Sequence, residues 1–136
     1  MLLVDTNVLI DVLEDDQQWA QWSIDQLRNQ AKLHQLAINP IIYAELSLVF
    51  TRFEELDKTI ATLGLTFLEL PRTALFLAGR AFLQYKRSKG TKQNVLSDFL
   101  IGAHAASANI PLLTRDTRRY RTYFPSVSLI APESKK

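Results

Sequence analysis

The sequence predicts an α/β fold with a central, mainly parallel five-stranded sheet flanked by helices. Short continuous apolar runs suit strands that are buried on both faces of a parallel sheet. These runs alternate with longer segments whose apolar residues recur at helical spacing, and such alternation is typical of parallel sheets. The 136 residues, 47% of them hydrophobic, are enough for one domain, which we expect to span residues 1–136.

Five apolar runs are the expected strands. The first run ends before Asp5, Thr6 and Asn7, which favour a turn. The expected strands cover residues 2–4, 36–38, 65–70, 110–114 and 127–130.

Helices are expected between these strands. Apolar residues recur at spacings of four, three and four over residues 20–31 and again over residues 74–85. Asn39 and Pro40 predict a further helix start, with Asn as the N-cap and Pro at the first helical position. Another helix is expected over residues 95–108.

Two aspartates directly follow predicted strands. Asp5 follows the first strand, and Asp116 follows the fourth after one intervening residue. Ligand sites of open parallel sheets lie beyond the carboxyl ends of the strands, so these two residues are the first candidates for a site. Taken singly, each could equally be a helix N-cap or a turn residue.

Two further acids interrupt apolar helix faces. Glu45 lies between Ile41 and Leu48 at helical spacing, so its carboxylate is expected to be partly buried. Asp98 heads a stripe of small and apolar residues on the helix of residues 95–108. Asp98 could equally have only a structural role, because it lies near the N-terminus of that helix, where the helix dipole favours an anion.

Buried carboxylates need a counter-charge, because burying one alone costs several kcal/mol. No histidine or lysine is spaced to serve all four acids, and His34 and His104 are interpreted as structural. All-oxygen coordination suits Mg²⁺ or Mn²⁺, and we expect one or two such ions.

The sequence also contains four segments that follow one another along the chain in this order: VDTNVLIDVL, NPIIYAEL, SDFLIGAHA and LLTRDTRRY. Together they span nearly the whole chain and resemble the PIN-domain nucleases. The compact length is similar to that of the VapC-type toxins of bacterial toxin-antitoxin pairs. The resemblance implies a PIN-like three-layer sandwich with its acids gathered at the carboxyl edge of the sheet.

The resemblance further implies a metal-dependent endoribonuclease that hydrolyses RNA phosphodiester bonds, with Mg²⁺ as cofactor and a cognate antitoxin as partner. It places the catalytic and metal-binding acids at Asp5, Glu45, Asp98 and Asp116, with auxiliary roles for Asn7 and Thr114. Two other functions stay open at this point. One is a PIN nuclease in RNA maturation without a toxin role. The other is a noncatalytic RNA- or protein-binding module whose acids only cap helices, and such a module would bind no metal.

Charge is distributed unevenly along the chain. Residues 1–60 hold ten acids and four bases, a net charge of −6, whereas residues 61–136 hold four acids and twelve bases, a net charge of +8. The basic part suggests a polyanion partner, although a solvated basic face explains it equally well. The bases nearest the acids, which are the candidates for RNA phosphate contacts, are Lys86, Arg87, Lys89, Lys92, Arg115, Arg118, Arg119 and Arg121.

The composition excludes several classes of protein and suggests a second copy as partner. Without cysteine there can be no disulfide, thiolate zinc site, iron–sulfur cluster or thiol nucleophile. No run reaches the roughly 18 uninterrupted apolar residues of a membrane helix, so we expect a soluble cytoplasmic protein. Residues 75–85 are apolar on nearly all sides, which suggests that this helix contacts both the core and a homodimer partner.

Overall fold

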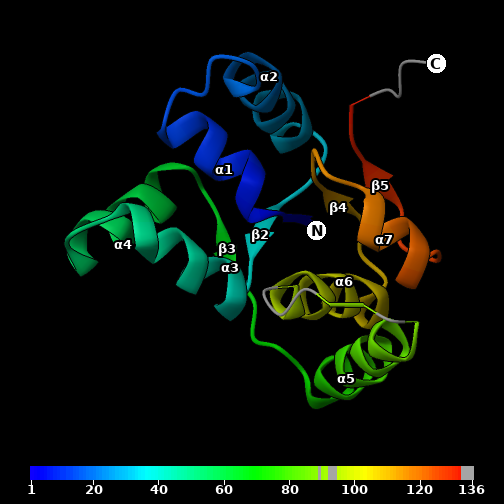
Figure 1. The fold of residues 1–136 in the computed structure, drawn as a ribbon. Coiled ribbons are helices and arrows are strands. Elements are labelled where there is room, and N and C mark those ends of the chain that lie inside the picture. The colour runs from blue at the N-terminus through cyan, green and yellow to red at the C-terminus, as the bar shows by residue number, and fades with distance from the viewer. Residues whose placement is uncertain (89, 92–94, 133–136) are drawn as a thin grey trace.

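The computed structural model describes residues 1–88, 90–91 and 95–132, and these form a parallel five-stranded sheet with helices around it (Figure 1). The strand order is β3-β2-β1-β4-β5, and every neighbouring pair is parallel. The strands are β1 (Leu2–Val4), β2 (Leu36–Ile38), β3 (Thr66–Phe67), β4 (Leu112–Leu113) and β5 (Leu129–Ile130). The predicted α/β fold with a parallel sheet is therefore confirmed.

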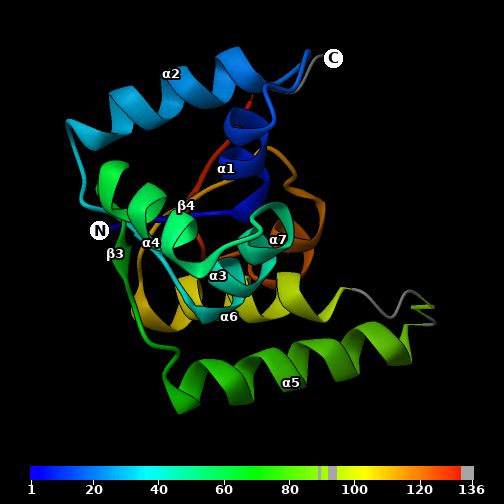
Figure 2. The same cartoon turned by 90° about the vertical axis from the view of Figure 1, so that its left-hand side faces the viewer.

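Helices cover the sheet from two sides. Figures 1 and 2 show α1 and α2 on one side of the strands, and the antiparallel pair α5 and α6 on the other. Among the described residues, no helix has both the length and the apolar character needed to cross a membrane. The α-helices are α1 (Thr6–Leu13), α2 (Ala20–Ala31), α3 (Pro40–Leu46), α4 (Phe53–Thr62), α5 (Arg72–Arg87), α6 (Leu96–Ala108) and α7 (Arg118–Tyr123), and a short 3-10 helix covers Ser47–Val49.

The connectivity creates one switch point at the centre of the sheet. From β1 the chain adds β2 and β3 on one side and later returns to add β4 and β5 on the other. Leu3 is in register with both Ala37 and Leu112, so the ends of the three central strands lie together. A crevice opens beyond the carboxyl ends of strands at such a point. The residues that follow β1 and β4 therefore face each other there.

Several predicted elements match the structure closely. The first two strands and the helix of residues 20–31 have the predicted bounds. Asn39 caps α3 as predicted, because its Oδ1 accepts a hydrogen bond from the Ile42 backbone amide at 3.0 Å and Pro40 follows at the first position. The helix predicted over residues 95–108 begins one residue later, at Leu96, and ends at Ala108 as predicted, because the left-handed backbone of Asn109 (φ 54°) stops it.

Other predicted elements differ from the structure. The last three strands are only two residues long each, because the apolar runs at residues 65–70, 110–114 and 127–130 continue into loops. β3 is an edge strand and is partly exposed, although burial on both faces was expected. The helix that carries Glu45 ends at Leu46, so Leu48 leaves the expected face and is 84% exposed. No helix was predicted from the sequence over the residues of α4.

The contact between α6 and α7 brings the C-terminal third of the chain close to the switch point. Gly102 on α6 lies against the Phe124 ring, and a Cβ at this glycine would come within 2.5 Å of that ring. Phe99, on the same helix, packs edge-on against Tyr123 with ring centroids 5.0 Å apart. The small residue and the aromatic pair fix α7 beside the N-terminal half of α6, where Asp98 lies.

Candidate active site

Asp5 is the most buried of the predicted acids, with 4% of the residue exposed. It follows β1 and caps α1, because its Oδ1 accepts a hydrogen bond from the Thr6 backbone amide at 2.8 Å. Its Oδ2 accepts hydrogen bonds from the hydroxyls of Thr114 and Tyr120, both at 2.8 Å. One oxygen of Asp5 therefore caps α1, whereas the other faces the chain beyond β4.

The environment of Asp5 opposes its ionisation. Burial raises the pKa of this carboxyl from 3.8 to about 6, and the charge of Asp98 adds to the rise. The hydrogen bonds from Tyr120, Thr114 and Thr6 favour the ionised form and oppose this effect without cancelling it. A carboxylate whose pKa is raised at a crevice is a candidate functional group, and a nearby cation would lower its pKa again.

Asp98 and Asp116 lie with Asp5 around one small polar cavity. The cavity has a volume of about 40 Å³ and is lined by Asp5, Asn7, Asp98, Asp116, Arg119 and Tyr120. Asp98 comes from the first turn of α6, and Asp116 from the loop between β4 and α7. Three acids that are far apart in sequence thus come together at the predicted edge of the sheet. About 15 Å³ holds one water molecule, so the cavity has room for an ion with part of its hydration shell.

Asp98 and Asp116 have opposite pKa shifts. Burial raises the pKa of Asp98, the charges of Glu45 and Asp116 raise it further, and the charge of Arg119 lowers it. Burial alone would also raise the pKa of Asp116, but the hydrogen bonds and charge of Arg118 outweigh burial and lower it. The pKa shifts of the two acids therefore differ because burial dominates at Asp98, whereas Arg118 outweighs burial at Asp116.

Glu45 is set back from the cavity. It is half-buried on α3, and its Oε1 accepts a hydrogen bond from the Thr6 hydroxyl at 2.6 Å. Its charge raises the pKa of Asp98 and of Tyr120, so it lies close enough to act on the cavity without lining it. The partial burial of Glu45 agrees with the expectation from its sequence position.

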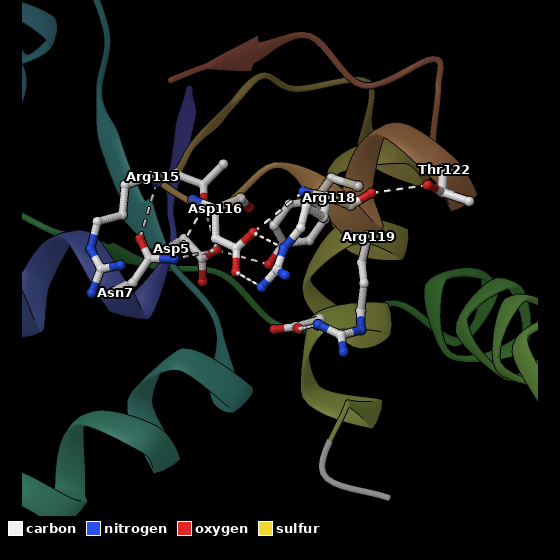
Figure 3. A network of polar contacts seen from close by, with 10 residues as sticks. Asp5, Asn7, Arg115, Asp116, Arg118, Arg119 and Thr122 are labelled. Carbon is white, nitrogen blue, oxygen red and sulfur yellow. Dashed lines mark hydrogen bonds and ion pairs between the residues drawn. The ribbon is translucent and has the colours of Figure 1, made fainter. Parts of the chain in front are cut away.

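Each carboxylate at the cavity has a donor of its own. Asp116 pairs with the Arg118 guanidinium at 3.3 Å, and Asp98 with that of Arg119, also at 3.3 Å (Figure 3).

Within the described part of the chain, no three Asp, Glu or His side chains are gathered tightly enough to hold a metal ion together. The donor set nevertheless fits Mg²⁺ or Mn²⁺, because it consists of carboxylate oxygens and Mg²⁺ needs only one or two direct protein ligands besides water.

The two auxiliary residues hold the acidic loop in place. Asn7 donates from Nδ2 to Thr114 Oγ1 at 3.2 Å and to Asp5 Oδ2 at 3.3 Å, and its Oδ1 accepts from the Arg115 amide at 3.3 Å. Thr114 Oγ1 in turn accepts from the Asp116 backbone amide at 3.2 Å. These contacts tie the end of β1 to the loop after β4.

The sequence analysis missed two residues that shape this region. Tyr120 lines the cavity, is buried and donates to Asp5. Asp11 is 2% exposed and accepts from Arg115 Nε at 2.7 Å and from Ser23 Oγ at 3.1 Å. Helical spacing could have indicated Asp11, because it lies four residues after Asn7 in α1, whereas Tyr120 carried no such signal, because Asp116 precedes α7.

The predicted RNA-contacting bases divide into different groups. Arg119 lines the cavity, whereas Arg118 lies beside it in a pair with Asp116, and Figure 3 shows both side chains projecting from α7. Arg115 is held in the ion pair with Asp11 and lies over the Trp19 ring at 5.7 Å, so its guanidinium already has a structural partner. Lys86, Arg87 and Arg121 are exposed, the first two at the end of α5, whereas Lys89 and Lys92 lie outside the described residues.

His104 has a structural position. It is buried in α6, and its Nδ1 lies 3.1 Å from Asn39 Nδ2, which makes Nδ1 the acceptor because the amide nitrogen can only donate. Burial lowers the pKa of His104, which favours this neutral form. Neither His104 nor His34 lines the cavity.

Comparison with known proteins identifies the family. The sequence profile of the PIN domain matches residues 2–125. The chain belongs to the PIN domain family. A comparison with curated proteins finds no match. Several solved structures share the PIN fold with this chain, all at less than 25% sequence identity.

Three of these structures come from toxin-antitoxin systems. VapBC2 from Rickettsia felis, bound to a DNA fragment from its promoter, has a TM-score of 0.73 at 19% identity and covers 97% of this chain and 98% of its own. VapBC-1 from nontypeable Haemophilus influenzae has a TM-score of 0.71 at 18% identity and 96% coverage of both chains. A toxin-antitoxin complex from Klebsiella pneumoniae has a TM-score of 0.59 at 24% identity and covers 93% of this PIN chain and 95% of its own.

Proposed function

We propose that this PIN protein is a metal-dependent endoribonuclease that acts as the toxin of a toxin-antitoxin pair. The observation that carries the proposal is the meeting of Asp5, Asp98 and Asp116 around one cavity at the switch point of the sheet. Membership in the PIN domain family, which includes nucleases, supports the hydrolysis of phosphodiester bonds as the reaction class.

The three cavity acids and Glu45 would hold one or two Mg²⁺ or Mn²⁺ ions. We assign Asp5 and Asp116 as direct ligands, and Asp98 and Glu45 as partners of bound water or of a second ion. A bound divalent ion would supply positive charge for the scissile phosphate and would acidify a water molecule. Thr114, Tyr120 and the Thr6 amide would keep the Asp5 carboxylate in one orientation, because they hold both of its oxygens.

RNA would bind at the rim of the cavity through its phosphates. Arg118 is 79% exposed and lies directly beside Asp116, so it can leave this weak surface pair for a phosphate. Lys86, Arg87 and Arg121 are the further candidates among the described residues, and contacts of this type position a strand without selecting a base sequence. Raising the salt concentration should therefore weaken RNA binding, whereas a flat salt response would contradict the phosphate contacts.

The test of the nuclease is RNA cleavage with Mg²⁺, with EDTA and with two variants. We expect Asp5→Asn, a nearly isosteric change, and EDTA each to abolish cleavage. Asp25→Asn is the matched control, because Asp25 is exposed on α2 and does not line the cavity. Cleavage that survives both Asp5→Asn and EDTA would contradict the proposed site, and absence of metal binding would favour the noncatalytic module instead.

The toxin role rests on the neighbouring structures, which are toxin-antitoxin complexes. We expect expression of this chain to arrest growth and co-expression of a protein encoded directly beside it to restore growth. Growth arrest by the wild type but not by Asp5→Asn would connect toxicity to the nuclease site. RNA cleavage without growth arrest would favour a role in RNA maturation.

The chain is also proposed to form a homodimer through the outer face of α5. Ala74, Ala78 and Ala81 face the core, whereas Leu75 is 45% and Phe76 is 72% exposed on the same helix. We expect a dimeric mass in light scattering at micromolar concentration and a monomeric mass for Phe76→Asp. A monomeric wild type under these conditions would contradict the homodimer.

A further inference from the structure

Arg119 differs from the other bases of the region because its side chain enters the cavity. It lines the cavity together with Asp5, Asp98 and Asp116, and its Nη1 lies 3.3 Å from Asp98 Oδ2. Its side chain is 20% exposed, whereas that of the preceding residue, Arg118, is 79% exposed. In Figure 3 the Arg119 side chain extends from α7 toward α6, away from the Arg118 side chain.

The hydrogen bonding of Arg119 is incomplete. Its Nε is buried and has no hydrogen-bond partner among the residues that the structure describes. The contact to Asp98 is long, because a hydrogen bond between a guanidinium and a carboxylate is usually about 2.7–2.9 Å. A planar guanidinium has five donors, and its geometry matches two oxygens of a carboxylate or a phosphate. Arg119 therefore has donor capacity for an anionic ligand at the cavity.

Arg119 and a metal ion would compete for the same carboxylate. The charge of Arg119 favours the ionised form of Asp98, which is the form a metal needs, but its Nη1 contacts an oxygen that a metal would use. A divalent ion on Asp98 would repel the guanidinium. Because Asp98 Oδ2 already contacts Arg119 Nη1 at 3.3 Å, an ion held by that oxygen would displace the guanidinium.

We infer that Arg119 exchanges partners during the reaction cycle: it neutralises Asp98 while no metal is bound and binds a phosphate oxygen of the RNA once Asp98 holds a divalent ion, directly or through water. This inference rests on the proposed function, since it requires a metal and an RNA substrate at this site. It separates Arg119 from the exposed bases, because those would contact RNA in the same way whether or not metal is bound.

The experiment compares Mn²⁺ binding and RNA cleavage for Arg119→Gln, Arg119→Lys and the control Arg28→Gln, which changes an exposed arginine of α2 that does not line the cavity. Mn²⁺ affinity is measured by titration calorimetry without RNA. A cation within about 4–6 Å of a carboxylate changes its affinity for a proton by about tenfold or more, and the same field acts on a metal ion. We expect Arg119→Gln to bind Mn²⁺ about tenfold more tightly, and Arg119→Lys and Arg28→Gln to remain near the wild type.

Cleavage is then measured at saturating Mn²⁺ over a range of RNA concentrations. We expect kcat/KM of Arg119→Gln to fall by about tenfold, because a charged hydrogen bond to phosphate is lost, although its metal affinity has risen. Opposite changes in these two quantities distinguish exchange from misfolding, which would weaken both. Unchanged or weaker Mn²⁺ binding by Arg119→Gln, or an unchanged kcat/KM, would overturn the inference.

Failure of the inference can be separated from failure of the proposed function. If the wild type binds Mn²⁺ and cleaves RNA, and Asp5→Asn does not cleave, an unchanged Arg119→Gln overturns the partner exchange alone. If the wild type binds no Mn²⁺, or if Asp5→Asn cleaves as well as the wild type, the proposed site fails and the partner exchange fails with it.

Discussion

The buried charge of Asp5 predicts a specific dependence of stability on pH. Its pKa is about 6 in the folded protein and 3.8 in the unfolded chain, so the folded protein binds the proton more tightly. The stability that this proton contributes is fully present below pH 3.8 and is lost as pH rises through 6. Between pH 4.5 and pH 7.5 the loss amounts to about 2 kcal/mol, from the difference in proton binding between the two states. Asparagine at position 5 cannot titrate and removes this loss.

We therefore expect the difference in unfolding free energy between Asp5→Asn and the wild type to shift by about 2 kcal/mol in favour of Asp5→Asn from pH 4.5 to pH 7.5. Urea unfolding with EDTA present, followed by circular dichroism at both pH values, measures this shift. Comparing two pH values cancels any fixed effect of the amide. Asp116→Asn is the control without such a shift, because the pKa of Asp116 is lowered from 3.8 in the folded protein, and its contribution to stability is therefore lost only below the pH range of the experiment. Parallel pH curves for Asp5→Asn and the wild type would refute the reasoning.

Three further predictions concern contacts around the site, each measured by urea unfolding. Arg115→Ala should destabilise the protein by about 3 kcal/mol and Asp11→Ala by less, because the first leaves a 2% exposed carboxylate without its cation, whereas the second leaves a partly solvated arginine; equal losses would contradict this. Tyr120→Phe should cost about 1–3 kcal/mol and move the pH midpoint of cleavage upward, because the Tyr120 hydrogen bond lowers the pKa of Asp5 in the wild type and its loss raises that pKa; Tyr123→Phe on the same helix is the control, and an unmoved midpoint would count against the contact. Asn39→Ala should cost about 2 kcal/mol, because α3 loses its cap and His104 loses its partner; a smaller loss than that of an exposed α2 variant such as Asn29→Ala would contradict it.

The sequence predicted best those features that depend on local or periodic signals. The first two strands are continuous apolar runs in the middle of the sheet, and Asn39 with Pro40 is a capping pattern that acts within four residues. The short strands failed in their bounds, because an apolar run that continues into a buried loop has the same sequence signal as one that stays in the sheet. For Glu45 the partial burial was expected for the wrong reason, since the helix ends one residue later at Leu46.

The contacts that shape the cavity had no such signal. Tyr120 and Asp5 are 115 residues apart, Arg115 and Asp11 are 104 apart, and neither pair follows a helical or strand period. The pairing of Arg119 with Asp98 depends on how α7 packs on α6, which Gly102 permits by leaving room for the Phe124 ring. Proximity to the acids in sequence suggested Arg115 and Arg119 equally, yet one faces Asp11 and the other enters the cavity.

The acids of the site are less exposed than the arginine at its rim. Asp5 is 4% exposed and the side chains of Asp98 and Asp116 are 36% and 43% exposed, whereas that of Arg118 is 79% exposed. Salt screens charges at the surface far more than buried ones. On the proposed function, raising KCl from 50 to 300 mM should therefore raise the KM for RNA severalfold while changing Mn²⁺ affinity much less. A loss of Mn²⁺ affinity as steep as the rise in KM would show that the acids and the bases share one solvent-exposed environment, and it would contradict a partly buried metal site beneath a basic rim.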